Sequence, residues 1–209
     1  MNKSLVGIVA FIALVIGIYV AISIQPPVAA PEYLQAYPEP RPLAPVELLS
    51  HTGEAIKNDW FYEQWTLAFV GYTFCPDICP TTLAELKGAY PELQAIASQY
   101  PIEVLFLSVD PKRDTQERLH EYIQFFNPEF TAATAQHKAL FPLVRSMGMA
   151  YAIVDSTDDP NYLVDHSASV VLINPQGKVV GRFKPHHEPG KLAISSMQQI
   201  IQDMKTIAG

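Results

Sequence analysis

Residues Gly71–Pro80 read Gly-Tyr-Thr-Phe-Cys-Pro-Asp-Ile-Cys-Pro and contain both cysteines of this 209-residue chain, Cys75 and Cys79. The apolar segment before them, Trp65–Val70, predicts a buried strand that leads into the cysteine loop. Residues Leu83–Leu93 carry apolar side chains at helical spacing, which predicts a helix that begins near the cysteines. We therefore expect a strand, a loop and a helix N-terminus to meet at the two thiols.

The spacing of the cysteines favours a joint chemical role. Side chains four positions apart in a helix lie on one face, with their β-carbons about 6 Å apart. Backbone amides and the helix dipole at an N-terminus favour the thiolate over the thiol. Thiolates are soft ligands that select Cu(I), zinc or iron–sulfur clusters. The pair therefore indicates either a soft-metal site or dithiol redox chemistry.

Two sulfurs leave a metal ion with too few ligands, so a metal site here needs a further donor. The segment Tyr162–Ser167 reads YLVDHS and offers His166. This histidine lies just before the apolar segment Ala168–Ile173, which predicts a strand.

Other residues near the cysteines are expected to support the site. Asp77 and Asp110 are candidates for orienting the histidine or adjusting the charge of the thiolates, as carboxylates near metal sites do. Tyr72, Phe74 and Ile78 are expected to form an apolar collar that limits access of water.

The segments after the cysteine helix continue the alternation of strands and helices. Ile102–Val109 is a near-continuous apolar run, as expected for a central strand covered on both faces. Asp114 stands three residues before Glu117, which predicts a capped start of the next helix. Met149–Val154 predicts a further strand.

The C-terminal part of the chain predicts an antiparallel hairpin and a final helix. The turn Asn174–Gly177 separates the apolar segment Ala168–Ile173 from Lys178–Phe183. Pro189 is expected to open the last helix, whose apolar face includes Met197. A parallel βαβ half joined to such a hairpin and helix predicts an α/β fold of the thioredoxin-like kind, a mixed sheet flanked by helices.

The N-terminal segment has the length and composition of a single transmembrane helix. Leu5–Ile24 contains no charge, and its 20 residues, at about 1.5 Å per residue, suffice to cross a hydrocarbon core of roughly 30 Å. Lys3, the only charge before it, favours a cytoplasmic N-terminus and an exported remainder. A cleaved signal peptide is the alternative, because Val28–Ala30 resembles a cleavage site. We expect residues 1–24 to be the anchor.

Residues 25–45 are rich in proline, which favours an extended polyproline II tether between anchor and domain. A disordered linker would have the same composition. The folded domain is expected to comprise residues 46–209. It should open with a short hairpin at Val46–Leu49 and the turn Thr52–Glu54.

The charge balance of the chain is acidic. It carries 14 Lys and Arg residues against 21 Asp and Glu residues, a net charge of −7. Because nucleic-acid binding requires basic surfaces, this balance argues against a nucleic-acid partner. An acidic surface would suit a basic partner protein.

Together, the motifs resemble the Sco/SenC family of membrane-tethered copper proteins. Three segments match the family in order and spacing: Gly71–Pro80, Ser108–Thr115 and Val164–Ser167. The resemblance implies a thioredoxin-like fold, an uncleaved membrane anchor and bound copper, Cu(I) or Cu(II). It also implies that Cys75, Cys79 and His166 are the copper ligands.

The resemblance further implies a copper metallochaperone that matures the binuclear copper site of cytochrome c oxidase. The implied partner is the copper-bearing subunit of a terminal oxidase, with other periplasmic copper carriers as further partners. The implied location is the inner membrane, with one span and the domain facing the periplasm, or the mitochondrial intermembrane space in a eukaryote.

Three other roles of the cysteine pair stay open at this point. A structural disulfide between Cys75 and Cys79 would close a short segment and stabilise the fold little. A thiol–disulfide reductase that keeps the client's cysteines reduced is a stronger rival, because the thioredoxin-like fold commonly carries a redox C-x-x-C motif. In that case Cys75 and Cys79 are the redox pair of an enzyme. A copper or redox sensor is the third possibility.

Overall fold

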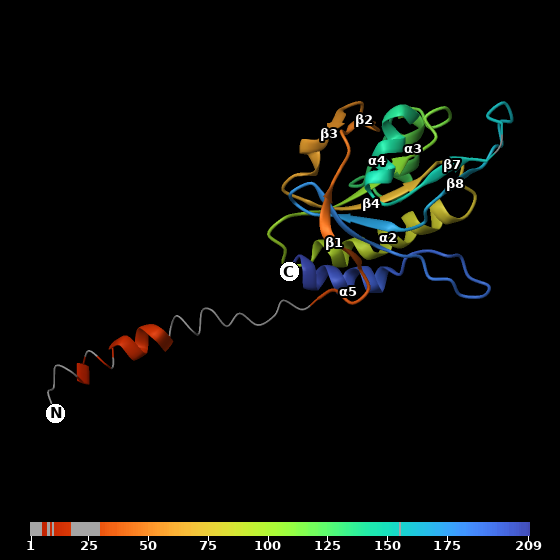
Figure 1. Cartoon of the computed structure of the whole chain (residues 1–209). Helices are drawn as coiled ribbons and strands as arrows, with labels where there is room; N and C mark the ends of the chain where they lie inside the picture. Colours follow the sequence, from red (N-terminus) through yellow and green to blue (C-terminus); the bar gives the residue numbers. More distant parts are fainter. Residues whose placement is uncertain (1–5, 8, 10, 18–29, 155) are drawn as a thin grey trace. The chain divides into compact units, whose positions relative to one another are not determined.

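The structure is a computed structural model that describes residues 6–7, 9, 11–17, 30–154 and 156–209. The chain divides into two compact units, Met1–Ala30 and Pro31–Gly209 (Figure 1). In the first unit the described residues between 6 and 17 are helical. The expected anchor at residues 1–24 falls partly outside the described residues. Among the described residues, no helix combines the length and hydropathy needed to span a membrane.

Strands and helices alternate through the second unit. Its strands are β1 (Gln35–Pro42), β2 (Glu47–Ser50), β3 (Ala55–Lys57), β4 (Trp65–Gly71), β5 (Ile102–Ser108), β6 (Thr131–Thr134), β7 (Tyr151–Ile153), β8 (Val164–His166), β9 (Val170–Ile173) and β10 (Lys178–Phe183). Its helices are α2 (Ile78–Gln94), α3 (Gln116–Phe126), α4 (His137–Ser146) and α5 (Met197–Ile207), with the 3-10 helix η1 (Asn58–Phe61).

The main sheet has the strand order β1-β10-β9-β4-β5-β6-β2-β3. Strands β4, β5 and β6 are parallel, and the helices α2 and α3 connect them in turn. Strand β9 pairs antiparallel with β4 and forms a hairpin with β10. The sheet thus has the predicted thioredoxin-like plan of a parallel βαβ half joined to an antiparallel hairpin and a last helix.

Strand β4 lies in the middle of the sheet because both of its faces are apolar. Leu67 and Phe69 point into one hydrophobic core, and Ala68 and Val70 point into the other. All four side chains are fully buried. A strand buried on both faces is expected to be a continuous apolar run rather than an alternating one, as the sequence predicted here.

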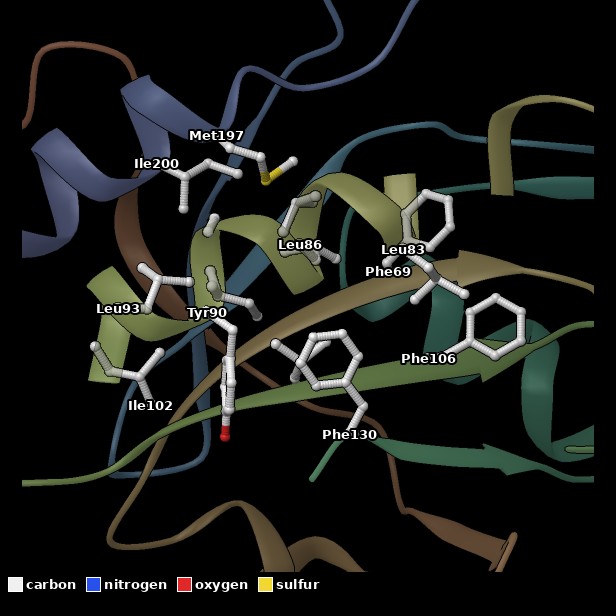
Figure 2. Close-up of a cluster of buried hydrophobic side chains, with 14 of the residues drawn as sticks. Phe69, Leu83, Leu86, Tyr90, Leu93, Ile102, Phe106, Phe130, Met197 and Ile200 are labelled. Carbon is white, nitrogen blue, oxygen red and sulfur yellow. The ribbon is translucent and has the colours of Figure 1, made fainter. Parts of the chain in front are cut away.

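One of the two cores lies between the sheet and the helices α2 and α5. Figure 2 shows Phe69 and Phe106 of the sheet near Leu83 and Leu86 of α2, with Ile200 of α5 packed against the same cluster. Burying such a side chain contributes about 1.5–3 kcal/mol to stability. This packing fixes the N-terminal end of α2, and with it one cysteine, relative to β4.

The folded unit begins earlier than the expected residue 46. Strand β1 pairs antiparallel with β10, so residues 35–42 of the segment predicted to be a tether form an edge strand of the sheet. Prolines are tolerated there because one side of an edge strand needs no hydrogen-bond partner. In addition, the buried carboxylate of Asp203 on α5 accepts hydrogen bonds from the three amides of Glu32–Leu34 at 2.6–2.9 Å.

One further strand prediction is confirmed, and the predicted start of the last helix needs correction. The strand predicted at Met149–Val154 is β7, which pairs with β8 in a separate two-stranded sheet rather than joining the main one. The last helix begins at Met197 and not at Pro189. Gly190 has a φ of +78°, in the left-handed region that a right-handed helix excludes.

Candidate metal centre

The cysteine loop connects the C-terminal end of β4 to the first turn of α2. Cys75 lies in this loop, and its amide donates to the carbonyl oxygen of Tyr72 at 3.2 Å. Cys79 is the second residue of α2, which begins at Ile78. The prediction that both thiols share one face of a helical turn is therefore wrong, because Cys75 precedes the helix. Its sulfur instead accepts a long contact of 3.5 Å from the amide of Cys79.

The last residue of β4, Gly71, makes room for the buried sulfur. A β-carbon at this position would lie 2.5 Å from the Cys79 Sγ and 2.8 Å from the ring of Phe106. Glycine within a strand often marks such a close approach. The glycine that opens the motif is thus explained by the packing of the cysteine eight positions later.

His166 reaches the cysteines from the other side, as the last residue of β8. Its Nε2 lies 3.4 Å from the Cys79 Sγ, and its Nδ1 lies 3.4 Å from the carbonyl oxygen of Ser167. The rings of Phe69 and Tyr72 pack edge-on against the imidazole, with centroid distances of 6.1 and 5.9 Å. These contacts hold the ring with one nitrogen directed at the sulfurs.

The structure thus brings together the three residues that the resemblance implied as ligands. Both thiols are free, Cys79 is fully buried and Cys75 is half-buried. One donor atom from each of Cys75, Cys79 and His166 lies within 4.8 Å of the other two. Among the described residues, no other group of three or more His, Cys, Asp or Glu residues has such a geometry.

The surroundings shift the pKa values of the two thiols in opposite directions. The hydrogen bond with the Cys79 thiol lowers the pKa of Cys75 to about 4, assisted by His166 and by the amides of Cys79 and Asp77 and opposed by burial. Burial, together with the hydrogen bond to Cys75 and its charge, raises the pKa of Cys79 well above its ordinary value. At neutral pH Cys75 is therefore a thiolate, and Cys79 is a protonated thiol that donates to it.

The two candidate aspartates lie in different environments. Asp77 is exposed at the N-cap position of α2, where its side chain caps no amide. Asp110 is 1% exposed and pairs with the Nε of Arg113 at 2.5 Å. Its other oxygen accepts a hydrogen bond from the hydroxyl of Tyr162. Asp110 therefore faces a cation and a phenol, whereas the Asp77 carboxylate faces solvent.

Asp114 is a residue whose role the sequence analysis missed. Its carboxylate, 1% exposed, accepts from the amide and hydroxyl of Thr73 at 3.0 and 2.7 Å and from the hydroxyl of Ser108 at 2.5 Å. It thus ties the cysteine loop to the end of β5, while burial raises its pKa. The helix α3 is capped instead by Thr115, whose side chain accepts from the amide of Arg118 at 3.2 Å.

A signal for Asp114 existed in the predicted topology. The carboxyl ends of adjacent parallel strands meet at one edge of a sheet, which is where ligands bind in open α/β sheets. This rule would have placed the polar residues just after Ile102–Val109 beside the cysteine loop that follows Trp65–Val70. Asp114 was instead interpreted as a helix cap, because it stands three residues before Glu117, and its position beside the cysteine loop was overlooked.

The predicted apolar collar is only partly present. Tyr72 is buried beside the histidine and Ile78 is half-buried, but Phe74 is 49% exposed. The ring of Phe74 lies instead under two guanidinium groups, with the Cζ atoms of Arg113 and Arg118 at 4.8 and 5.3 Å from its centroid. The tip of the loop therefore faces solvent and two cations.

The donor set fits a soft metal ion such as copper. Metal–sulfur and metal–nitrogen bonds are about 2.0–2.3 Å long, as in zinc sites. Two donors bound to one ion therefore lie at most about 4.6 Å apart, and these donor atoms already lie within 4.8 Å of one another. Two sulfurs and an imidazole nitrogen are the soft and intermediate ligands found in copper sites.

Fold and site together define the class: a thioredoxin-like α/β protein that carries a Cys-Cys-His group able to hold a metal ion at the end of its central strand. The SCO1/SenC family model matches residues 21–202 of the chain. The chain belongs to this family.

Individual relatives agree with this assignment. The human mitochondrial SCO1 homolog is 31% identical over 151 residues, which cover 72% of this chain and 50% of that protein. A SCO2-like protein of Rickettsia prowazekii is 37% identical over 142 residues, covering 66% of this chain and 67% of the relative. The chain spans about half the length of the mammalian mitochondrial relatives that it matches.

The fold is also that of a solved copper-bound relative. The crystal structure of Arabidopsis thaliana ScoI with copper bound superposes with a TM-score of 0.65 at 28% sequence identity. The match covers 78% of this chain and 98% of that one. The thioredoxin-like plan inferred from the sequence is therefore the plan of this family.

Proposed function

We propose that this protein is a membrane-anchored copper metallochaperone whose ligands are Cys75, Cys79 and His166. The observation that supports it best is the approach of these three donors to within 4.8 Å of one another. Membership of the Sco/SenC family points to a role in assembling the copper site of cytochrome c oxidase. The client is then the copper-bearing subunit of a terminal oxidase.

The unequal exposure of the sulfurs suggests how copper is passed on. Cys75 is half-buried and Cys79 is fully buried. An incoming thiolate of the client can reach a copper ion from the Cys75 side, so that Cys75 is the first ligand to be exchanged. Cys79 and His166 hold the ion until the client has supplied further donors. The net negative charge of the chain would favour a basic client surface.

The anchor and location are part of the proposal. Residues 1–24 would span the inner membrane once and place the unit Pro31–Gly209 in the periplasm, or in the intermembrane space of a mitochondrion. The short segment before Pro31 would then be the linker. Alkaline phosphatase fused after Gly209 should be active in bacteria. An inactive fusion, together with an active cytoplasmic reporter at the same position, would reverse this topology.

A thiol–disulfide reductase is the second candidate, and the acidity of Cys75 favours it. The Cys75 thiolate would attack a client disulfide, form a mixed disulfide with one client sulfur and release the other as a thiolate. Cys79, once deprotonated, would attack the Cys75 sulfur and release the second client thiolate. The client disulfide is thereby reduced, and Cys75 and Cys79 are oxidised to a disulfide.

One pair of assays separates the two candidates. The copper-loaded full-length chain is mixed with the reduced, metal-free soluble domain of the client, and copper on the client is measured after separation. In parallel, the reduced, metal-free chain is mixed with the oxidised client, and client thiols are counted. The chaperone proposal expects copper transfer in the first assay. Thiol formation in the second without transfer in the first would establish the reductase instead.

A further inference from the structure

Arg113 lies between the cysteine loop and the polypeptide that leads to His166. Its guanidinium Cζ lies 3.5 Å from the ring centroid of Tyr162, four residues before the histidine. The same carbon lies 4.8 Å from the ring of Phe74 and 5.5 Å from that of Tyr72, both in the cysteine loop. One side chain therefore contacts both halves of the metal centre.

Hydrogen bonds fix the guanidinium on the histidine side. Its Nη1 donates to the carbonyl oxygen of Pro160 at 3.0 Å, and its Nε donates to Asp110 at 2.5 Å. Asp110 also accepts from the hydroxyl of Tyr162, so one buried carboxylate holds both the cation and the phenol. The planar guanidinium group of arginine can stack on aromatic rings and donate hydrogen bonds in fixed directions at the same time, and the ammonium group of lysine does not reproduce this.

A second contact continues the connection to the histidine. The amide of Val164, two residues before His166, donates to the hydroxyl of Tyr72 at 3.4 Å, and the Tyr72 ring packs edge-on against the imidazole. Strand β8 pairs with β7 and lies outside the main sheet. The main-sheet ladder therefore does not hold the histidine in place, and the restraint comes from the pairing of β8 with β7 and from these side-chain contacts.

We propose that Arg113 is a positioning residue that, together with Asp110 and Tyr162, keeps the His166 Nε2 within reach of the two sulfurs. The inference rests on the proposed copper ligands. We call the contacts of Arg113 with Asp110, Tyr162 and the cysteine loop the latch, because they connect the two halves of the site. The latch acts on the nitrogen donor and leaves the sulfurs in place, because Cys79 is buried in the core on α2 and Cys75 packs against the same core. Loosening the latch should therefore weaken the binding of Cu(II), which prefers nitrogen donors, more than the binding of Cu(I).

The test compares Arg113→Lys and Tyr162→Phe with the unmodified full-length chain. Arg113→Lys keeps the positive charge but removes the planar guanidinium group, and Tyr162→Phe removes only the hydroxyl that donates a hydrogen bond to Asp110. Changes around the ligands of a metal site typically cost about 10–100-fold in affinity. We expect a loss of this size for Cu(II) in competition titrations and less than about threefold for Cu(I). Because Tyr162→Phe is mild, it keeps the test decisive if Arg113→Lys fails to fold.

A copper-free measurement accompanies the titrations. Hydrogen–deuterium exchange of residues 160–166 in the reduced, metal-free chain should be faster in both variants, while exchange in β4 and α2 stays unchanged. Arg118→Lys is the matched control, because Arg118 also reaches the cysteine loop, donating to the Thr73 hydroxyl at 3.2 Å. Among the described residues it has no hydrogen bond to the segment around Tyr162, so exchange of residues 160–166 should not respond.

The outcomes distinguish this inference from the proposed function. Equal losses of Cu(I) and Cu(II), or unchanged exchange at residues 160–166, would overturn the latch. If the unmodified chain and His166→Ala bind Cu(II) alike, the histidine is no ligand and the proposed site itself fails. The exchange experiment then still reports whether Arg113 restrains the segment that carries His166.

Discussion

The two halves of the candidate metal centre are built in different ways. The cysteine half is part of the main fold, because Gly71 ends the central strand β4 and Cys79 lies in the first turn of α2, the helix packed against that strand. The histidine half is a three-residue strand, β8, that pairs with β7 and lies outside the main sheet. The sulfurs are therefore placed by the core, and the nitrogen is placed by local contacts.

This difference suggests that the sulfurs and the histidine contribute differently to metal binding. In the proposed site the two sulfurs beside the core would hold Cu(I), and a histidine on a separate element could approach or withdraw while the main sheet stays intact. Such an arrangement suits a protein that must both hold copper and release it. The predictions below test the two halves separately.

The largest effect is expected from the cysteine half. Cys75→Ser and Cys79→Ser should each weaken Cu(I) and Cu(II) alike, by at least about 100-fold, because a direct ligand should matter more than its surroundings. The measurement is a competition titration against chelators of known affinity. If either variant bound Cu(I) as tightly as the unmodified chain, the sulfur pair would not be the core of the site.

The second prediction concerns pH and distinguishes the two thiols. Because the pKa of Cys75 is lowered to about 4, its thiolate persists above that pH and is lost as the pH falls below it. The rate at which iodoacetamide alkylates Cys75 should thus be nearly constant from about pH 5 to 8. Cys79, whose pKa is raised, should react only at alkaline pH. Peptide mass spectrometry of the reduced, metal-free chain measures both rates.

The pKa of an ordinary cysteine thiol is about 8.5. If both thiols followed one curve with that pKa, the hydrogen bond between them and the proposed asymmetry of the sulfurs would be absent in solution. The experiment needs no metal, so its result does not depend on the identity of the ion.

The third prediction concerns the histidine half. His166→Ala should keep the fold and a reversible Cys75–Cys79 disulfide, retain part of the Cu(I) binding, and lose at least about 10–100-fold in Cu(II) affinity. Cu(II) prefers additional nitrogen donors in a tetragonal arrangement, so its thiolate absorption band should disappear. Absorption spectroscopy of the chain, with its cysteines reduced and then loaded with Cu(II), provides the measurement. An unchanged band would remove the histidine from the site.

The smallest effect is expected from the packing around the buried sulfur. Gly71→Ala would place a β-carbon 2.5 Å from the Cys79 Sγ, and overpacking of this kind costs about 1–3 kcal/mol of the free energy of unfolding. Gly88→Ala on α2 is the matched control, because its β-carbon would meet nothing within 4 Å. The control should be neutral or stabilising by up to about 1 kcal/mol. Urea denaturation compares the two, and equal stabilities would refute the steric role of Gly71.

The cysteine half was more predictable from the sequence than the histidine half. The strand, the loop and the helix around Cys75 are encoded by neighbouring residues, so apolar periodicity predicted β4 and α2 correctly. Periodicity does not report which strands pair, and so it did not separate β7 and β8 from the main sheet. His166 was proposed because two sulfurs need a further donor, and the family resemblance implied it as a ligand, but no local pattern placed it beside Cys79.

Other misses have similar causes. Proline content predicted a tether where β1 forms, because composition does not show that an edge strand can tolerate proline or that Asp203 binds the amides of Glu32–Leu34. Asp114 was assigned to a helix cap because the capping pattern is local, whereas its contact with Thr73 spans 41 positions in the sequence. Long-range side-chain contacts are what the sequence alone could not supply.

X-ray absorption spectroscopy of the copper-loaded full-length chain tests most directly whether Cys75, Cys79 and His166 hold one ion. For Cu(II) the account predicts two sulfur scatterers and at least one imidazole nitrogen, and for His166→Ala loaded with Cu(I) it predicts the two sulfurs without the imidazole nitrogen. A copper ion with fewer than two sulfur neighbours, or with an unchanged imidazole signal in His166→Ala, would contradict it.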